Sequence, residues 1–306
     1  MIVRTGFSMG AAGNVADLDR FAEVVDELER LGFDSIWVPE VVTATSLDPL
    51  AALAFAAGRT TKLKLGSHLA VPGRAPARLA KELATLDRLS RGRLLLTFVI
   101  GLAQPAELSA YGVQARQRTA ILDETLSLLR RWWAGETVDH DGPFFQYQGV
   151  AIEPRPAQQP LEVWFGGMTP SSLRRCGELA DGWIPGFIDP IAAGTARRAI
   201  QQAAADAGRT IDPEHFGMNV QYRRGPLDGT SKDRLRQRFP ALSDADIDEL
   251  VPDADQPGAL GDRLEAYLAE GFSKFVLRPA APVTDWPQEL GRLAIEALPH
   301  QTRRPG

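Results

Sequence analysis

Short apolar runs alternate along this chain with segments in which apolar residues recur every three or four positions. The segment 17–33 shows the second pattern, with Val25 and Leu28 on one helical face. Gly32 follows at the point where a glycine commonly ends a helix. Because apolar runs and helical segments succeed each other without an obvious break, the pattern predicts a chain built from repeated strand and helix units.

Eight apolar runs are typical of β-strands, and a helical pattern follows each of them. They cover residues 2–9, 34–40, 62–71, 93–101, 162–167, 182–187, 216–222 and 274–279. Asp48 and Pro49 predict the start of one helix, as cap and first-turn residue. Another helix carries leucines at 79, 83, 86 and 89 on one face, and a long helix is expected at about 116–134.

Eight such units favour an α/β fold of the (β/α)8 TIM-barrel class, because parallel strands must be joined by crossover helices that cover the sheet. We expect a single domain over residues 1–306. The alternative is an open doubly wound sheet, whose dinucleotide-binding form needs G-x-G-x-x-G after the first strand. The sequence there, "GFSMGAAGN", lacks that spacing, and no Walker A motif occurs.

Two stretches do not fit the barrel as simple loops. Residues 136–160 carry turn residues and aromatics, which predicts an inserted hairpin. Residues 224–258 are charged and bounded by prolines, and "SDADIDEL" within them predicts a short capped helix. Long insertions in such barrels usually lie at the C-terminal ends of the strands, so we expect both to flank a site.

Composition narrows the functional classes. The 306 residues are 44% hydrophobic, enough for one large core, and their net charge of −5 comes from interleaved acidic and basic side chains. The sequence contains no stripe of basic residues, so nucleic-acid binding is not expected. No apolar run is long enough to span a membrane. One cysteine and four scattered histidines predict neither a disulfide nor a metal site. We therefore expect a cytoplasmic, metal-independent protein whose partner is a small-molecule substrate.

The stretch "FGGMTPSS" contains the most informative turn. Gly166 and Gly167 end an apolar run, and Thr169 and Pro170 open a helix directly after it. Glycines allow a ligand to approach the backbone, and the free N–H groups and dipole of a helix N-terminus favour an anion such as phosphate. A tight turn without a ligand is the alternative interpretation of the same residues.

Five stretches of the sequence, one of which contains this turn, follow one another in a recognisable order and spacing. They are "GFDSIWVPE" (32–40), "AKELATLDRLSRGRL" (80–94), "YGVQARQRTAILDETLSLLRRWWAGE" (111–136), "FGGMTPSSLRRCGELADGWIP" (165–185) and "GFSKFVLRP" (271–279). Their order and spacing resemble the bacterial luciferase-like monooxygenase superfamily, in particular its actinobacterial branch of coenzyme F420-dependent oxidoreductases. The resemblance covers about residues 1–190 and resumes at 259–280. It implies a (β/α)8 barrel that binds reduced FMN or the deazaflavin F420.

The resemblance also implies roles for individual residues. Glu40 and His68 would be the catalytic residues, and the His68–Leu69 peptide would be a cis bond forming a bulge behind the cofactor ring. Matches to the family's cofactor-binding positions are Phe7, His68, Leu69, Gly101, Gly166, Gly167, Met168, Thr169, Trp183 and Arg278. Gly166 to Thr169 would hold the cofactor phosphate, and Arg278 would help hold the cofactor by bidentate contact.

This chain departs from the family pattern at two places. Val41 stands where the family often has a histidine after the second strand, so acid–base chemistry there would fall to Glu40. Thr97 and Val99 replace two glycines of a G-x-G-x-G stretch of which Gly101 remains, so their side chains would narrow the space beside the ring.

Three functions stay open at this point. The first is an F420-dependent oxidoreductase that transfers hydride between the deazaflavin C5 and a small apolar or aromatic substrate. The second is an FMN-dependent monooxygenase of the same superfamily. The third is a barrel with a degenerate cofactor site and a non-redox role. A homodimer also stays open, since barrels of this family commonly form dimers.

Overall fold

The computed structural model describes residues 1–10, 19–239 and 242–302. Strands lie where the eight apolar runs predicted them. They are β1 (Arg4–Phe7), β2 (Ser35–Pro39), β3 (Lys64–Ala70), β4 (Leu94–Val99), β7 (Val163–Phe165), β8 (Gly182–Trp183), β9 (Gly217–Tyr222) and β10 (Lys274–Pro279). Their pairings are parallel, and each strand is followed in the chain by a helix. This is the element order of a (β/α)8 TIM barrel, so the predicted fold class is confirmed.

Local sequence signals place the ends of the helices. The helices are α2 (Phe21–Leu31), α3 (Pro49–Arg59), α4 (Pro76–Leu89), α5 (Pro105–Tyr111), α6 (Arg118–Trp133), α7 (Pro170–Leu179), α8 (Pro190–Asp206), α9 (Gly229–Arg238), α10 (Asp244–Leu250), α11 (Ala259–Ala269) and α12 (Trp286–Ala297). Asp48 caps α3 by accepting a hydrogen bond from the Ala51 amide at 2.9 Å. Gly32 ends α2 with a φ of 88°. Residues 17–18 of the first predicted helical segment lie outside the described residues.

The chain forms two compact units. The first unit comprises residues 1–10, 20–37 and the described residues from 164 onward, and the second is built on Val38–Val163. That the whole of 1–306 is one domain stays a prediction. No helix in the described ranges is both long enough and apolar enough to cross a membrane.

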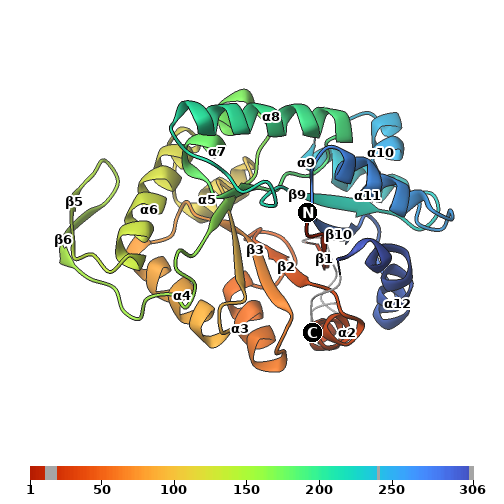
Figure 1. Ribbon diagram of the computed structural model, residues 1–306, viewed down its shortest axis with the longest axis horizontal. Coiled ribbons are helices and arrows are strands. Elements are labelled where there is room, and N and C mark those ends of the chain that lie inside the picture. The colour runs from red at the N-terminus through yellow and green to blue at the C-terminus, as the bar shows by residue number, and fades with distance from the viewer. Residues whose placement is uncertain (11–18, 240–241, 303–306) are drawn as a thin grey trace. The chain divides into compact units, whose positions relative to one another are not determined.

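In the first unit, a parallel sheet positions the C-terminal strand ends along one edge. Strand β10 pairs with β1 on one side and with β9 on the other. A bridge between Trp183 and Phe216 joins β8 to the start of β9, and β7 pairs with β8. Helices α7 and α8 lie side by side in this unit, and α12 lies next to α2 (Figure 1).

In the second unit, β3 and β4 form a continuous parallel ladder from Leu65↔Leu94 to Ala70↔Val99. Helix α4 packs between α3 and α6. Its buried leucines at 79, 83 and 86 confirm the predicted apolar face. Leu89 was expected to be buried on the same face but is 64% exposed, at the last position of α4.

Both predicted insertions are present. The first contains the antiparallel hairpin of β5 (Val138–Asp141) and β6 (Gln146–Val150), which lies beside α6 (Figure 1). The second contains α9 and α10, and Ser243 and Asp246 form the predicted capping box of α10. Leu235 and Ile247 of this second insertion pack with Phe187, which lies outside it, in a small buried apolar cluster.

Two helical glycines give a matched test of helix packing in the first unit. A Cβ at Gly177 of α7 would lie 2.6 Å from the Ile200 carbonyl oxygen of α8, whereas a Cβ at Gly291 of α12 would meet nothing within 4 Å. We expect Gly177→Ala to destabilise the fold by about 1–3 kcal/mol through overpacking. Gly291→Ala should stabilise it by about 0.5–1 kcal/mol, because alanine loses less backbone entropy in a helix. Urea unfolding of both variants measures the difference, and equal effects would contradict it.

Candidate functional site

The predicted site residues are divided between the two compact units, at the C-terminal ends of their strands. Glu40, His68, Leu69 and Gly101 belong to the second unit. The first unit contains Phe7, Gly166, Gly167, Met168, Thr169, Trp183 and Arg278. Each group is described within its own unit.

Glu40 follows β2 and is held by two partners in the second unit. Its Oε1 accepts a hydrogen bond from the Arg74 guanidinium at 2.6 Å, and its Oε2 accepts one from the Ala70 amide at 2.8 Å. Its own amide donates to the His68 carbonyl oxygen at 3.0 Å. The carboxylate therefore joins the ends of β2 and β3 and forms an ion pair with Arg74.

The protonation of Glu40 reflects competing effects. Burial raises the pKa of its carboxyl group above the usual value, while the Arg74 charge and the hydrogen bonds from Arg74 and Ala70 lower it. Burial has the largest effect, and the net direction is upward. A carboxyl group in this state is suited to holding a proton at a higher pH than an exposed glutamate.

His68 and Leu69 lie inside β3 rather than in a bulge. They pair with Thr97 and Phe98 of β4 in an unbroken ladder. Among the described residues, the cis peptide bonds precede Pro154 and Pro160. The prediction of a cis bond between His68 and Leu69 is therefore wrong, because regular parallel pairing continues through both residues.

The space beside Gly101, just after β4, is occupied by a tyrosine that the sequence did not indicate. Gly101 has a φ of +74°, and a Cβ on it would lie 2.5 Å from the ring of Tyr111 at the end of α5. The space beside Gly101 is thus occupied by this ring. Burial and the nearby carboxylates of Glu107 and Glu40 raise the pKa of the Tyr111 phenol, so it stays protonated.

Arg118 holds the segment that carries Gly101. Its Nη1 donates to the carbonyl oxygens of Ile100, Gly101 and Leu102 at 3.2, 2.9 and 2.9 Å.

The preceding strand, β4, contains Thr97 in place of a glycine of the family pattern. The Thr97 side chain is fully buried, and its hydroxyl finds no hydrogen-bond partner among the described residues. Side chains therefore fill the positions that the family pattern leaves open.

In the first unit, the predicted anion-binding turn has the expected local geometry. Thr169 caps α7 by accepting a hydrogen bond from the Ser172 amide at 3.2 Å, and Pro170 is the first helical residue. Gly167 has a φ of +95°, which favours glycine. Within the described ranges, the amides of Gly167, Met168 and Thr169 make no hydrogen bond, and these residues are exposed. An anion could reach these amides at the positive end of α7.

Trp183 supports this turn from beneath. Its side chain is fully buried, and its Nε1 donates to the Gly167 carbonyl oxygen at 2.9 Å. Its ring packs against Phe272, with the centroids 6.0 Å apart. The geometry therefore favours a positioning role for Trp183, while its predicted contact with a cofactor stays a prediction.

Phe7 and Arg278 differ in their surroundings. Phe7 is fully buried and packs against Phe33 and Trp286, and its contact with a cofactor stays a prediction.

Arg278 lies at the end of β10 and is partly exposed. A Cβ on Gly10 would lie 2.8 Å from its Nε, so Gly10 leaves room for this guanidinium. Gly10 was another residue that the sequence reasoning missed.

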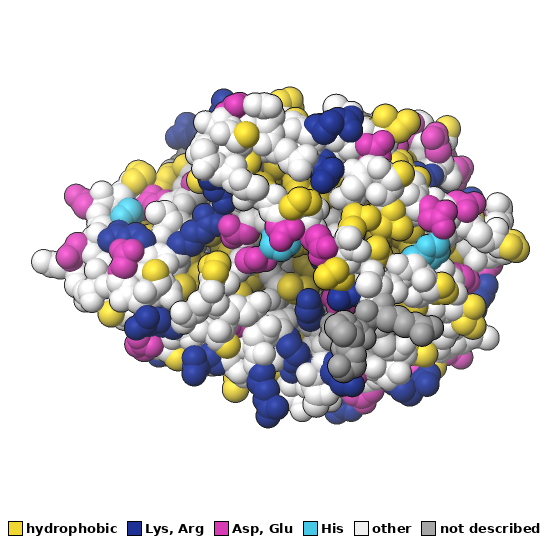
Figure 2. Space-filling view, viewed as in Figure 1, with side chains coloured by type: hydrophobic (Ala, Val, Ile, Leu, Met, Phe, Trp, Pro, Cys, Tyr) yellow, Lys and Arg dark blue, Asp and Glu magenta, His cyan; other side chains and the backbone are white. Residues whose placement is uncertain are grey.

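The described residues contain no group of three or more histidine, cysteine or acidic side chains that could hold a metal. Cys176 is buried, and burial raises the pKa of its thiol to about 12, so it is not an activated nucleophile. Figure 2 shows acidic and basic side chains interspersed over the viewed face.

Comparison with known proteins identifies the family. The luciferase-like monooxygenase family matches residues 1–224. The chain belongs to this family. The predicted family is therefore confirmed, and with it the general class of an oxidoreductase enzyme.

Two relatives illustrate the range of the family. The chain is 29% identical over 267 residues to the sulfoquinovose monooxygenase of Agrobacterium fabrum, covering 85% of this chain and 66% of the relative. It is 33% identical over 220 residues to the phthiodiolone/phenolphthiodiolone dimycocerosates ketoreductase of Mycobacterium kansasii, covering 70% of this chain and 58% of the relative. The chain thus spans less than two thirds of the length of these relatives.

Solved structures share the fold at lower identity. An F420-dependent secondary alcohol dehydrogenase in complex with an F420–acetone adduct superposes with a TM-score of 0.82 at 18% identity, covering 98% of this chain and 99% of the other. The oxygenating constituent of 3,6-diketocamphane monooxygenase from Pseudomonas putida, in complex with FMN, has a TM-score of 0.78 at 18% identity, with the same coverage of 98% and 99%. These likenesses confirm the barrel fold.

The buried carboxyl group of Glu40 gives a pH test. Because its pKa is raised in the fold, its contribution to stability is fully present below the pKa of the unfolded chain, about 4.3, and is lost as the pH rises through the folded pKa. We therefore expect Glu40→Gln to cost more unfolding free energy at pH 4 than at pH 7, measured by urea unfolding.

Glu27 of α2 is the matched control for this test. Arg30 donates a hydrogen bond to its carboxylate at 2.8 Å and lowers its pKa. A lowered pKa contributes stability above the unfolded pKa that is lost as the pH falls. Glu27→Gln should therefore show the opposite trend. The same trend in both variants would contradict the assignment for Glu40.

Proposed function

We propose that this protein is an F420-dependent oxidoreductase that transfers hydride between the deazaflavin C5 and a small apolar or aromatic substrate. The observation that carries the proposal is the turn at Gly166–Thr169 before α7. The exposed residues Gly167, Met168 and Thr169 have amides that make no hydrogen bond to any described residue, at the positive end of the helix. An anionic cofactor phosphate fits such a turn. A solved structure of the same fold, the F420-dependent secondary alcohol dehydrogenase, supports the choice of this cofactor.

Particular residues would hold the cofactor. Gly167, Met168 and Thr169 would donate their amides to the phosphate, and Trp183 would keep the turn in place through its bond to Gly167. Arg278 would add a charge-assisted contact. When bound, the deazaflavin supplies the hydride chemistry, and the protein contributes position, charge and exclusion of water.

Glu40 and His68 are the proposed acid–base residues. Glu40 follows β2 and donates its amide to the carbonyl oxygen of His68, which lies near the end of β3 in the second unit. The raised pKa of Glu40 allows its carboxyl group to hold a proton. Arg74 would orient the Glu40 carboxylate through their 2.6 Å contact. His68 would act from β3, with its ring nitrogens as donor or acceptor.

An FMN-dependent monooxygenase is the second candidate. The family includes monooxygenases, and one FMN-bound solved structure shares the fold. A flavin phosphate would use the same turn before α7. The third possibility is a barrel with a non-redox role. Two observations support it: Thr97 is buried, and Tyr111 fills the space beside Gly101.

Titration of the purified protein with F420 and, separately, with FMN tests the proposal. We expect F420 to bind with a micromolar Kd, measured by the change in fluorescence during the titration. Arg278→Ala should weaken it by about 10–100-fold through loss of a charged contact. Gly167→Val should weaken it at least as much, because a branched side chain strains the turn at a φ of +95° and meets Ser172.

Gly208→Val is the matched control for the glycine variant. Gly208 also has a positive φ, 69°, but a Cβ there would meet nothing within 4 Å. It should carry a similar backbone strain and leave the affinity for F420 unchanged. Tight binding of FMN alone would favour the monooxygenase. If neither cofactor binds, the redox proposal fails and the barrel fold stands.

A further inference from the structure

Gln221 lies near the C-terminal end of β9 in the first unit, and its side chain is not held by the fold. Only 8% of the residue is exposed, yet its carboxamide makes no hydrogen bond to any residue that the structure describes. The amide is not completely covered, so a group the size of water can reach it. A polar group in such a position is poorly hydrated, and its hydrogen bonds are unsatisfied until something binds it.

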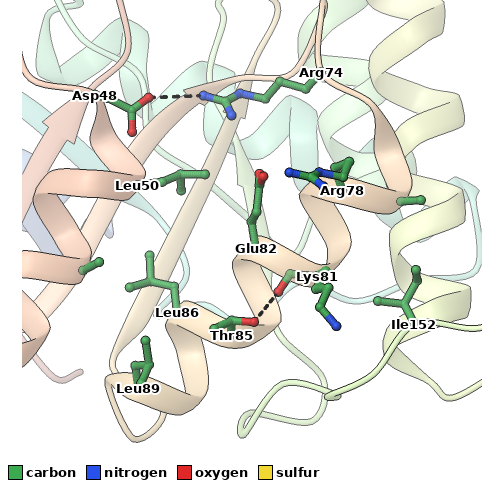
Figure 3. Close-up of a pocket in the computed structure, with 12 residues that line it drawn as sticks. Asp48, Leu50, Arg74, Arg78, Lys81, Glu82, Thr85, Leu86, Leu89 and Ile152 are labelled. Atoms are coloured by element: carbon green, nitrogen blue, oxygen red, sulfur yellow. Dashed lines mark hydrogen bonds and ion pairs between the residues drawn. The ribbon is translucent and has the colours of Figure 1, made fainter.

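Other polar side chains of this chain do have protein partners. Two residues earlier on the same strand, Asn219 donates its amide to the Pro185 carbonyl oxygen at 3.0 Å. In the second unit, a surface hollow between α3 and α4 is lined by polar groups that contact one another, such as Arg74 and Asp48 at 3.8 Å (Figure 3). The amide of Gln221 therefore differs from these groups in being both buried and unpaired within the described residues.

The packing of β9 and β10 shows which face of the sheet carries Gln221. Tyr222 faces the helices, because the Arg224 guanidinium, which pairs with α12, lies 5.7 Å from its ring centroid. Phe275 of β10 also faces them, against Tyr267 of α11. Successive side chains of a strand point to opposite faces, so Gln221 faces away from the helices. In a (β/α)8 barrel this is the inner face, and ligands bind at its C-terminal end.

Gln221 belongs to a row of polar residues at this end of the sheet. Its register partner on β10 is Arg278, and Ser8 follows the last pair of β1 and β10. Residues paired in register point to the same face. The Arg278 guanidinium leans toward the segment after β1, since a Cβ on Gly10 would lie 2.8 Å from its Nε. The positive charge is therefore on the β1 side of the row, and Gln221 forms its uncharged end.

We propose that Gln221 is a substrate-binding residue that hydrogen-bonds an uncharged oxygen of the substrate, in a ketone or a hydroxyl group. A carboxamide has N–H donors and a C=O acceptor, so it can donate to a ketone and accept from a hydroxyl. A site of this kind rejects an analogue without the oxygen, because the buried amide is then left unpaired. That the ligand is a substrate rests on the proposed function, whereas the binding preference does not.

Two probes of the same shape test the preference. Cyclohexanone carries the oxygen, and methylenecyclohexane has a methylene group in its place. Ligand-observed NMR on the purified protein gives the Kd of each probe, in one series without cofactor and in a second with F420 added. We expect the wild type to bind the ketone at least about 10-fold more tightly than the alkene.

Variants of Gln221 should remove most of this preference. Gln221→Met has a similar length and no amide, so the ketone should bind about 3–10-fold more weakly while the alkene binds no worse. Gln221→Glu keeps the shape but loses the N–H donors, so it should also weaken binding of the ketone. Gln288→Met is the matched control, because Gln288 is an exposed glutamine of α12 and should have no effect on either probe.

Thermal unfolding of the unliganded protein gives a second readout. Because the Gln221 amide has no partner among the described residues, an apolar side chain of similar volume should not weaken the fold. We expect Gln221→Met to unfold at the temperature of the wild type or up to about 3 °C higher. A structural role of the amide would instead lower the unfolding temperature.

Several results would overturn the proposal. One is a wild type that binds the ketone in neither series, or that binds both probes equally. Another is a Gln221→Met variant that keeps the preference or unfolds at a lower temperature. Tighter binding of cyclohexanecarboxylate than of the ketone, also weakened by Gln221→Met, would assign the position to an anion. A failed F420 titration would overturn the proposed function alone, because the cofactor-free series and the unfolding measurement do not depend on it.

Discussion

Parallel pairing of the strands is the constraint from which the arrangement of this protein follows. A parallel neighbour can be reached only by a crossover connection, and in this chain the crossovers are helices. Within each unit, the C-terminal ends of paired strands therefore lie at one edge of the sheet. Residues that follow one strand meet residues near the end of a neighbouring strand there, which brings Glu40 next to His68 in one unit and the Gly167 turn next to Trp183 in the other.

Beyond these strand ends, a few polar side chains make the hydrogen bonds to the backbone that strand pairing makes within the sheet. Arg74 and the Ala70 amide hold both oxygens of Glu40, so the carboxylate is a structural link as well as a chemical candidate. Arg118 does the same for the segment after β4 by binding three carbonyl oxygens. Side chains that satisfy backbone groups in this way keep irregular segments rigid. Rigid strand ends are what a bound organic cofactor requires.

The departures from the family pattern change how the site is interpreted. Thr97 is buried without a hydrogen-bond partner among the described residues, and Tyr111 occupies the space that Gly101 leaves. The family resemblance implies a glycine-rich end of this strand beside the cofactor ring, and in this chain Thr97 and Tyr111 occupy that region instead. The turn at Gly167 keeps its helix cap, and its amides make no hydrogen bond within the part of the chain that the structure describes. The proposed contacts with the cofactor phosphate and those with its ring therefore depend on different segments of this chain.

The sequence by itself determined the elements, because strand and helix periodicity and the caps at Gly32, Asp48, Thr169 and Ser243 are local signals. It also determined the family, through the order of short motifs. Tertiary structure decided the partners of the side chains. Nothing local to Glu40 indicates that Arg74, 34 residues later, will bind it, or that Tyr111 will cover Gly101. The cis bond expected at His68 was wrong for the same reason: whether a strand bulges depends on the neighbour it pairs with.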